Sequence, residues 1–456
     1  MPEKQHSTTD TICALATPPG VAGLAVIRIS GPNALATCDM FFRGATMVSE
    51  SEGHRIHYGW WVLNEAKVDT VTVSVFRLPN SYTGEDIVEV GCHGGVFVTE
   101  QILVGLRTVG LRLAEPGEFT RRAFLNRKLD LTQVEAVADI IHAESRHGAQ
   151  IAARQLSGGF TKHLRVLREQ LLDVIALLEL ELDFSEEDVE FVDRSALKET
   201  VSKIIKDVEA TASSAHSAEV LRSGFHVAVV GYPNAGKSSL FNALLQRNRA
   251  IVSDEPGTTR DYLTETIFVD GYSVHLADTA GLRDTQDVVE LQGIALTRSL
   301  IEQSDLVLVV NDLQAGAHHS NALLEAIEVA FAGTPVVLVQ NKVDMVATKH
   351  PNRHVVLYCS ATHGTGIDAL RELFGEYIRA STTGITDVLV NARQALLLGS
   401  IGAVMRSALI GMDEGLTCDI FAVDIRSAIR LLGDITGEGW NPDVLDNVFS
   451  RFCIGK

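Results

Sequence analysis

The chain has 456 residues, of which 46% are hydrophobic and 21% are charged, and this composition indicates a globular protein of more than one domain. A formal net charge of −19 at pH 7 argues against a protein that binds nucleic acid over a broad surface. The cysteines form no C-x-x-C pair and no Cys/His cluster at metal spacing, so we expect neither a disulfide framework nor a structural zinc site.

The first 120 residues mix strand-like runs, such as "GLAVIRIS" and "DIVEVGCHGG", with Gly and Pro turns, and this predicts an α/β region. The opening "MPEKQHSTTD" lacks the apolar core of a signal peptide, and apolar stretches such as "QLLDVIALLELELDF" are too short or too charged to span a bilayer. We therefore expect a cytoplasmic protein with no membrane partner. The stretch "RRAFLNRK", residues 121–128, is the best candidate for a local basic site, although its charge pattern also fits a solvated helix face.

From about residue 130 the pattern becomes helical. "EQLLDVIALLELELDF" has helical periodicity, and the next amphipathic stripe consists of Leu197, Val201, Ile204, Ile205 and Val208. Buried strands then alternate with helices to about residue 380, which is typical of a doubly wound parallel sheet.

Helices resume after that sheet, with "ARQALLLGSIGAVMRSALIG" and "IFAVDIRSAIRLLG". The last begins near Asn441 and Pro442, and its apolar stripe consists of Leu445, Val448, Phe449 and Phe452. We expect one helical domain interrupted by an inserted α/β module, and two separate bundles are the competing topology.

A phosphate-binding loop is predicted at "GYPNAGKS", residues 231–238, because the G-x-x-x-x-G-K-S pattern follows a predicted strand and precedes a predicted helix. Backbone N–H groups and the helix N-terminus would face phosphate oxygens. Lys237 would reach the β- and γ-phosphates, and the hydroxyl of Ser238 would bind Mg²⁺. The predicted binding residues of this loop are Asn234, Ala235, Gly236, Lys237, Ser238 and Ser239.

Three later motifs each follow an apolar strand and together identify the nucleotide as GTP. "DTAG" supplies a carboxylate for Mg²⁺ and an N–H for the γ-phosphate, "NKVD" ends in a carboxylate that fits the two donors of guanine, and "SAT" offers a backbone N–H to the guanine oxygen. The residues concerned are Asp278, Thr279, Ala280, Gly281, Asn341, Lys342, Val343, Asp344, Ser360, Ala361 and Thr362.

Between the first two motifs lies "GTTR", where a switch loop is expected, although an ordinary Gly-Thr turn also fits. Thr259 is then the Mg²⁺-binding switch threonine, alongside Gly257 and Thr258. The glutamine that many GTPases place after D-x-x-G is missing, because that position is Leu282. Glu290 is one of several carboxylates in the following segment, and on sequence alone it also fits a solvated helix face.

The sequence resembles the family of tRNA-modification GTPases known as MnmE or TrmE over essentially its full length. The resemblance is carried by "DTICALATPPG", "NSYTGEDIVEVGCHGG", "PGEFTRRAFLNRKLDLTQVEAVADII", "DFSEEDVEF" and the terminal "FCIGK". It implies a folate-binding and dimerisation domain at residues 1–126, a helical domain in two parts at 127–217 and 381–456, and an inserted G domain at 218–380.

The resemblance also implies the chemistry. The homodimer would form a heterotetramer with an FAD-dependent protein, MnmG or GidA. Together they would add a carboxymethylaminomethyl or aminomethyl group at carbon 5 of the wobble uridine of certain tRNAs. A tetrahydrofolate derivative supplies the carbon, and both the 5-formyl and the 5,10-methylene form fit, as do glycine and ammonia for the nitrogen.

Site residues are implied position by position. Folate would be bound by Arg28, Glu89, Lys128 and Lys456, and K⁺ by Asn234, Ser253, Glu255 and Thr258 in a GTP-contacting switch that also includes Asp254 and Pro256. Glu290 becomes the candidate for positioning the attacking water. The tail thiol of Cys453 is either a nucleophile or a structural thiol at a helix end.

One departure and two alternatives accompany the resemblance. Val21 and Ala22 stand where the family usually has Arg-Gly, so a cationic side chain is missing there. A ribosome-assembly GTPase switch shares the G motifs, but a KH-type loop or a second set of G motifs is not found. An autonomous one-carbon transferase with a regulatory GTPase is the third class of protein that these motifs fit.

Overall fold

A computed structural model describes residues 10–183, 194–246, 264–278, 298–315, 324–325, 327–331, 333–345, 356–382, 390–439, 442–450, 452 and 454–456. The chain divides into two compact units. Unit 1 contains residues 1–141, 154–205 and 400–456, and unit 2 contains residues 142–153 and 206–399. The predicted domain boundaries at residues 126, 217 and 380 stay a prediction.

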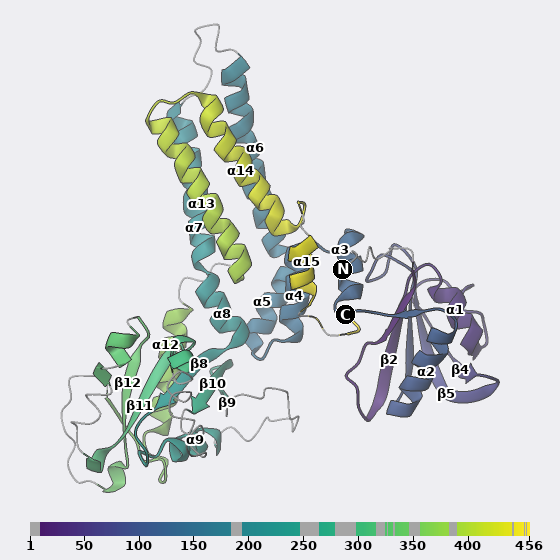
Figure 1. Cartoon of the computed structure of the whole chain (residues 1–456), viewed down its shortest axis with the longest axis horizontal. Coiled ribbons are helices and arrows are strands. Elements are labelled where there is room, and N and C mark those ends of the chain that lie inside the picture. Colours follow the sequence, from purple (N-terminus) through teal and green to yellow (C-terminus); the bar gives the residue numbers. More distant parts are fainter. Residues whose placement is uncertain are drawn as a thin grey trace, which may run out of the picture. The chain divides into compact units, whose positions relative to one another are not determined.

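The N-terminal part of unit 1 is a seven-stranded sheet in the order β3-β4-β5-β6-β2-β1-β7 (Figure 1). Its neighbours pair antiparallel except β1 with β7. Helices α1 (Ala34–Phe41) and α2 (Val96–Thr108) contribute Leu35, Phe41, Ile102 and Leu106 to the core beneath the sheet. The expected α/β region is therefore present. Its strands are β1 (Ile12–Leu15), β2 (Ala22–Ser30), β3 (Phe42–Gly44), β4 (Arg55–Leu63), β5 (Ala66–Phe76), β6 (Ile87–Gly94) and β7 (Arg112–Leu113).

A buried ion network fastens α3 (Glu118–Leu125) to this sheet. Arg122, which is 4% exposed, pairs with Glu118, with Asp10 at 2.6 Å and with Glu85 at 3.2 Å, and Arg112 also pairs with Glu118. Part of the predicted basic stretch 121–128 is thus structural, because Arg122 points into the protein rather than toward a polyanion.

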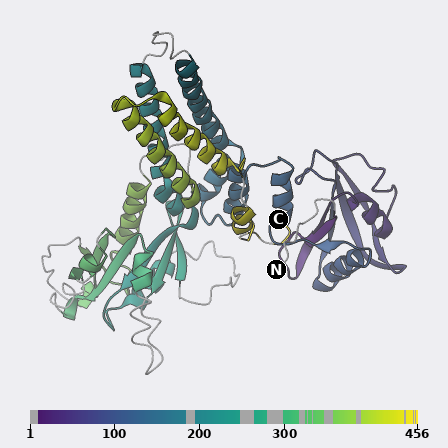
Figure 2. The ribbon, with the colours of Figure 1, turned by 45° about the horizontal axis from the view of Figure 1, so that its top comes forward.

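The helical part of unit 1 draws on both ends of the chain. Helix α14 (Cys418–Thr436) lies along α6 (Gly159–Asp183), as both ribbon views show (Figures 1 and 2). Arg426 pairs with Glu179 at 2.8 Å and Glu438 with Arg168 at 3.5 Å, so the two helices run antiparallel. The prediction of one helical domain interrupted by an insertion is confirmed, and the two-bundle topology is wrong.

The predicted helical stripes form the core of these helices. All five stripe residues of α7 (Arg194–Ser213) are buried. The last helix, α15 (Pro442–Phe449), begins where the sequence predicts, and Leu445 and Phe449 pack with Phe124, Leu131 and Val134, the last two from α4 (Leu131–Ile141). Phe452 joins this cluster from beyond the helix end.

Unit 2 contains a six-stranded sheet in the order β13-β12-β11-β8-β10-β9. Four neighbouring pairs are parallel and have apolar cores on both faces, as expected for a doubly wound sheet. The edge strand β9 pairs antiparallel with β10, which the periodicity of a single strand could not reveal. The strands are β8 (Phe225–Val230), β9 (Thr264–Val269), β10 (Tyr272–Asp278), β11 (Leu306–Asp312), β12 (Val336–Asn341) and β13 (Val356–Tyr358).

Residues 142–153, which precede the sheet by many residues, pack onto its β10 side. The ring of His147, at the start of α5 (Arg146–Leu156), stacks on Tyr272 with centroids 4.3 Å apart. Glu144 pairs with His275 at 3.1 Å, and Ser145 donates to the carbonyl of Leu221, in α8 (Ala215–Ser223). These contacts explain why residues 142–153 belong to unit 2, although the surrounding helices belong to unit 1.

Helix α13 (Ala392–Asp413) is long and apolar enough to cross a membrane by length and composition, which the sequence-based expectation overlooked. Its apolar residues lie on more than one side of the helix. Leu398, Ile401, Met405 and Ala408 are buried at helical spacing, while Leu396 is 74% exposed. A helix of this kind also occurs in the cores of proteins that span no membrane.

Candidate functional site

The phosphate-binding loop connects β8 to α9 (Lys237–Gln246), which confirms the strand and helix that the motif requires. The loop turns through Asn234 at φ +63° and Gly236 at φ +89°. A Cβ at Gly236 would overlap the amide nitrogen of Asn341, so only glycine fits there. Lys237, which is 7% exposed, donates to the carbonyls of Gly231 and Tyr232 at 2.8 and 3.0 Å.

The "NKVD" motif braces this loop. Asn341 ends β12 and donates through Nδ2 to the carbonyl of Ala235 at 3.1 Å. Lys342 Nζ donates to the carbonyl of Asn234 at 2.9 Å and pairs with Asp312 at 2.6 Å. The two motifs lie about a hundred residues apart in sequence, and the parallel sheet brings their strand ends together.

The base-recognition residues also meet. Asn341 Oδ1 accepts from the backbone N–H of Ala361 at 3.2 Å, which fixes the "SA" turn against "NKVD". The pKa of Asp344 is lowered, first by a hydrogen bond from Ser360 and also by His363. Asp344 therefore stays a carboxylate near neutral pH, which is the form that accepts two guanine donors.

The donors present fit Mg²⁺. Ser238 is exposed in the first turn of α9, and Asp278 ends β10, paired in register with Val229 of β8. Both positions are at the same edge of the sheet, and hydroxyl and carboxylate oxygens are the ligands that Mg²⁺ prefers. The switch residues 253–259, together with Thr279, Ala280, Gly281 and Glu290, lie outside the described residues, so their predicted roles stay predictions.

A second site centres on Arg28 of β2. Its Nε and Nη2 both lie 2.8 Å from Oε1 of Glu89 on β6, and its plane lies over the rings of Tyr82 and Phe119 at 5.4 and 5.5 Å. Nη1 donates to the carbonyl of Gly455 at 3.2 Å. Three of the four residues that the resemblance assigned to folate are thus joined, since Lys456 follows Gly455.

The C-terminal tail is fitted closely to the strands. Gly455 has φ +99°, and a Cβ there would overlap the carbonyl oxygen of Leu15. The ammonium of Lys456 lies 5.9 Å from the centre of the Tyr82 ring. Its pKa is lowered, first by burial and then by the Arg28 charge, with Glu89 opposing. The prediction that the tail reaches the folate residues is supported, although Cys453 itself lies outside the described residues.

Lys128, the fourth assigned residue, lies on a neighbouring loop. Its Nζ donates to the carbonyl of Pro79 at 3.0 Å, and the contacts in the described part of the chain do not join it to Arg28, Glu89 or Lys456. Sequence reasoning missed Tyr82, although an aromatic residue inside the quoted "SYTGED" loop was a visible signal. Its hydroxyl shares a hydrogen bond with Thr120 at 2.9 Å. Val21, where the family usually has Arg, is 94% exposed.

The cationic donors and the aromatic rings of this site favour one class of ligand. Arg28 and the ammonium of Lys456 lie near the side-chain carboxylate of Glu89, and the pKa of Lys456 is lowered first by burial and then by the Arg28 charge. An anionic ligand with a flat ring system, such as a folate, fits this donor set, because Arg28 and Lys456 can donate to its anionic groups and the rings of Tyr82 and Phe119 lie beside them.

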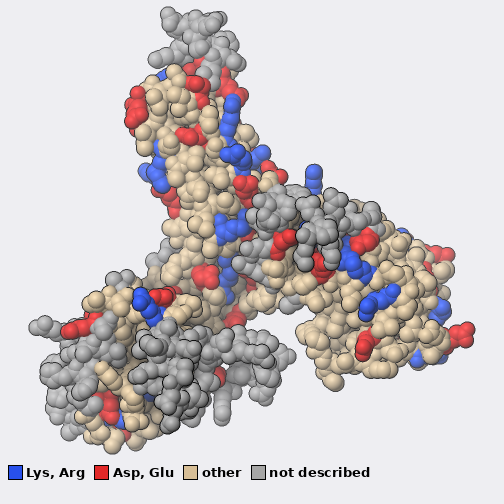
Figure 3. All heavy atoms as spheres, viewed as in Figure 1, with Lys and Arg blue, Asp and Glu red and all other residues tan. Residues whose placement is uncertain are grey.

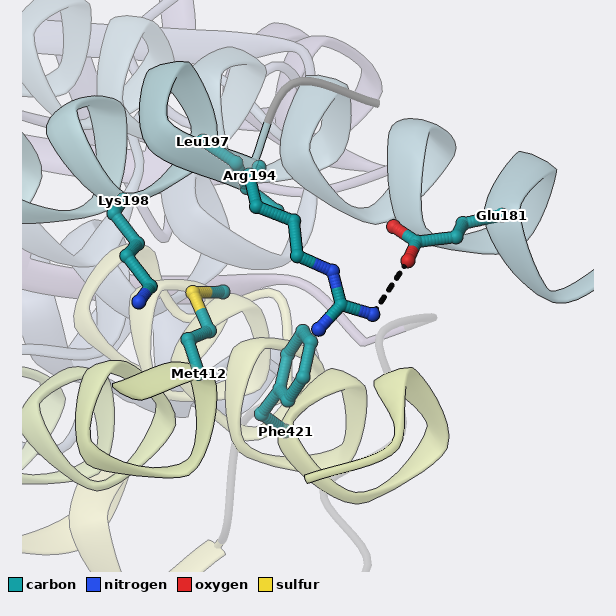
Figure 4. Close-up of a pocket in the computed structure, with 6 residues that line it drawn as sticks. All are labelled: Glu181, Arg194, Leu197, Lys198, Met412 and Phe421. Atoms are coloured by element: carbon teal, nitrogen blue, oxygen red, sulfur yellow. Dashed lines mark hydrogen bonds and ion pairs between the residues drawn. The ribbon is translucent and has the colours of Figure 1, made fainter. Parts of the chain in front are cut away.

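A small cavity in the helical part of unit 1 is separate from both sites. It is lined by Glu181, Arg194, Leu197, Lys198, Met412 and Phe421 (Figure 4). Arg194 pairs with Glu181 at 2.8 Å, and the apolar side chains of Met412 and Phe421 come from the neighbouring helices α13 and α14. No predicted site residue lines it, and its charged residues are held in ion pairs, Arg194 with Glu181 and Lys198 with Asp413.

Two known protein families match this chain, one at its N-terminal part and one over the rest. The family described as the GTP-binding protein TrmE N-terminus matches residues 11–128, and the family described as the MnmE helical domain matches residues 131–453. Relatives named tRNA modification GTPase MnmE cover nearly all of this chain. The protein of Christiangramia forsetii is 40% identical over 98% of this chain and 99% of its own. That of Listeria innocua is 37% identical over 98% and 99%.

Among solved structures, the G domain of the T. maritima FeoB iron transporter aligns with 34% of this chain and 98% of its own, at 26% identity and a TM-score of 0.25. That overlap carries no argument here, and the family assignment depends on the relatives that match the full length. On those matches, and on the joined G motifs, this chain belongs to the MnmE (TrmE) family of tRNA modification GTPases.

Proposed function

We propose that this protein hydrolyses GTP in unit 2 and uses the hydrolysis cycle to drive modification of tRNA at carbon 5 of the wobble uridine. The observation that carries the proposal is the presence of two built sites in one chain. One brings the phosphate-binding loop with Lys237 against Asn341, with Asp344 in the same motif to receive a guanine base, and the other joins Arg28, Glu89 and the C-terminal tail.

A folate-borne carbon is the group that we assign to the second site. Arg28 and Lys456 would bind the anionic ligand, and Glu89 orients Arg28 through the contacts at 2.8 Å. The folate, when bound, supplies the one-carbon unit, and the tail closes the site through Gly455. Cys453 is two residues from the Arg28 contact, so its thiol is our candidate for covalent chemistry.

K⁺ and Mg²⁺ are the ions that we assign to the nucleotide site. Mg²⁺ would bind Ser238 and Thr259, and K⁺ would bind Asn234 and the switch residues Ser253, Glu255 and Thr258. A cation beside the phosphates offsets charge that develops in the transition state, as an arginine finger does in other GTPases. Glu290 would orient the attacking water in place of the glutamine that is missing at Leu282.

The proposed assembly is a homodimer that joins an FAD-dependent partner in a heterotetramer. It is supported by the family assignment and by exposed apolar side chains on the N-terminal sheet, among them Tyr58 and Ile56 of β4. We expect the modified tRNAs to be made only by the complex.

Nucleoside mass spectrometry of tRNA from a deletion strain tests the whole proposal. We expect the carboxymethylaminomethyl and aminomethyl uridines to disappear and to return with the wild-type gene. Normal wobble uridines, with a defect in ribosome assembly instead, would overturn it. For the ion, we expect purified protein to hydrolyse GTP much faster in K⁺ than in Na⁺ at matched ionic strength, and equal rates would exclude the K⁺ site.

A further inference from the structure

Positive charge is concentrated in one part of this acidic chain. Segments 121–141 and 154–168 of unit 1 carry eight Lys and Arg but only three Asp and Glu, whereas the whole chain has a net charge of −19. Helix α6 is polarised in the same way. Its first turns carry Lys162, Arg165 and Arg168, and its remainder, from Glu169 to Asp183, carries only acidic charges.

These three cations form a strip on the helix surface, which we call the α6 strip. Lys162, Arg165 and Arg168 are all exposed and recur every three residues. A rise of about 1.5 Å per residue sets their side chains at steps of about 4.5 Å along the helix axis. Their long stems can therefore reach successive charges of one extended polyanion.

The strip is unusual because its charges are largely unpaired. Within the described residues, Lys162 and Arg165 have no ionic partner, and Arg168 has a loose contact of 3.5 Å to Glu438. Three of the four cations of α7 are paired with acidic residues: Arg194 with Glu181, Lys198 with Asp413 and Lys203 with Glu199, each at 2.8 Å. A solvated helix face of the ordinary kind resembles α7, where charges of both signs are interspersed.

The strip is continuous with the loop that follows α3. Thr161, next to Lys162, donates to Asp130, and Gln133 donates to the carbonyl of Leu156 at 2.9 Å. These bonds hold the beginning of α6 against residues 130–133, directly after the exposed Arg127. On the face of the molecule shown in Figure 3, Lys and Arg atoms recur along the helical part of unit 1.

We propose that the α6 strip binds the phosphate backbone of the tRNA. The inference rests on the proposed function, since it names the surface that the tRNA would use. Exposed cations at regular spacing gain most from a polyanion, because condensed counterions are released and because Lys162 and Arg165 have no ion pair to lose among the described residues. The strip positions the tRNA and reads no base, so binding here is expected to be independent of sequence.

The test is the salt dependence of tRNA binding by the full-length protein. In the variant Lys162→Ala/Arg165→Ala/Arg168→Ala we expect affinity at low salt to fall about 10- to 100-fold. The slope of log K against log salt should fall in magnitude by about two to three, roughly one for each lost phosphate contact. GTP hydrolysis without tRNA should be unchanged, which shows that the variant is folded.

A matched control removes equal charge from the same unit. Arg194→Ala/Lys198→Ala/Lys203→Ala on α7 should keep the wild-type slope, and Lys162→Arg/Arg165→Lys/Arg168→Lys should keep it as well. An equal loss of the salt-dependence slope in the α7 control would overturn the proposal that the α6 strip binds tRNA. An unchanged slope in the α6 variant would overturn it as well. If the wild-type protein binds no tRNA, the proposed function itself fails, so the two failures are distinguishable.

Discussion

At position 28 a single guanidinium contacts a strand, two aromatic rings and the C-terminus of its own chain. The carboxylate of Glu89 accepts from two of its nitrogens, and the carbonyl of Gly455 accepts from the third. The rings of Tyr82 and Phe119 lie next to the guanidinium. Charge-assisted bonds of this kind are directional as well as strong, so Arg28 fixes where the tail lies. Its role in any folate chemistry is therefore partly indirect, through Gly455.

Glu118 is the residue for which we predict a pH-dependent contribution to stability. Burial opposes its charge, but hydrogen bonds from Arg112, from the backbone of Glu115 and from Arg122 outweigh burial and lower its pKa from the ordinary 4.5 to about 2. The group then adds stability above its unfolded pKa, and this is lost as pH falls toward its folded pKa. This shift in the pKa of Glu118 corresponds to a contribution on the order of 3 kcal/mol to the free energy of unfolding at neutral pH.

We therefore expect Glu118→Gln to lower the free energy of unfolding at pH 7, and the difference from wild type to narrow as pH falls from about 5 to 3. Urea unfolding of both proteins across that range measures it. Glu52→Gln is a fair control, because Glu52 pairs with Arg55 only at the exposed surface. A constant difference at every pH would mean that Glu118 acts through packing and not through its charge.

Among the elements, the phosphate-binding loop has the tightest fit. Gly236→Ala would drive a Cβ into Asn341, so we expect the loop to move away from "NKVD" and GTP affinity to fall by about 100-fold or more. Calorimetric titration with a non-hydrolysable analogue measures this. Gly399→Ala in α13 is the matched control, since a Cβ there meets nothing within 4 Å. Unchanged affinity in Gly236→Ala would contradict the bracing of the loop by Asn341.

The tail is the second element with a sharp prediction. Arg28→Lys keeps the charge but loses the planar contacts to Glu89 and Gly455, so we expect the tail to release more readily. Carboxypeptidase B removes a C-terminal lysine, and it should cleave Lys456 several-fold faster in the variant than in wild type. The control variant Arg55→Lys changes an exposed ion pair, and carboxypeptidase B should cleave it at the wild-type rate. If Arg28→Lys and wild type are cleaved equally, Arg28 does not hold the tail.

At the scale of the whole molecule, the two units permit the two activities to be separated by mutation. We expect Cys453→Ser to hydrolyse GTP at a near-normal rate and to abolish or severely reduce tRNA modification. Thiol labelling of the native protein would report mainly on Cys453, because Cys13, Cys38, Cys92, Cys359 and Cys418 are buried and free. Loss of both activities would indicate a folding role, and normal modification would exclude chemistry at this thiol.

Local pattern was sufficient for the elements of this protein. The loop at 231–238, the stripe of α7 and the start of α15 follow from spacing, because backbone geometry gives helices and strands fixed periods. The sequence also indicated GTP, because four motifs recur in order after strands. Periodicity within one segment says nothing about pairing, so the antiparallel edge of β9 and the attachment of residues 142–153 to the sheet were not predictable.

By itself the sequence determined the α/β and helical class, the nucleotide and the family, since short-range patterns and full-length similarity suffice for these. Only the tertiary structure decided which cations are free to bind. Arg122 and Lys162 are both basic residues, and the sequence does not distinguish their environments. In the structure, Arg122 is buried in an ion network, and Lys162 is exposed without an ionic partner among the described residues. The physical reason is that a charge is neutralised by groups distant in sequence, and folding alone brings Asp10 to Arg122 or Gly455 to Arg28.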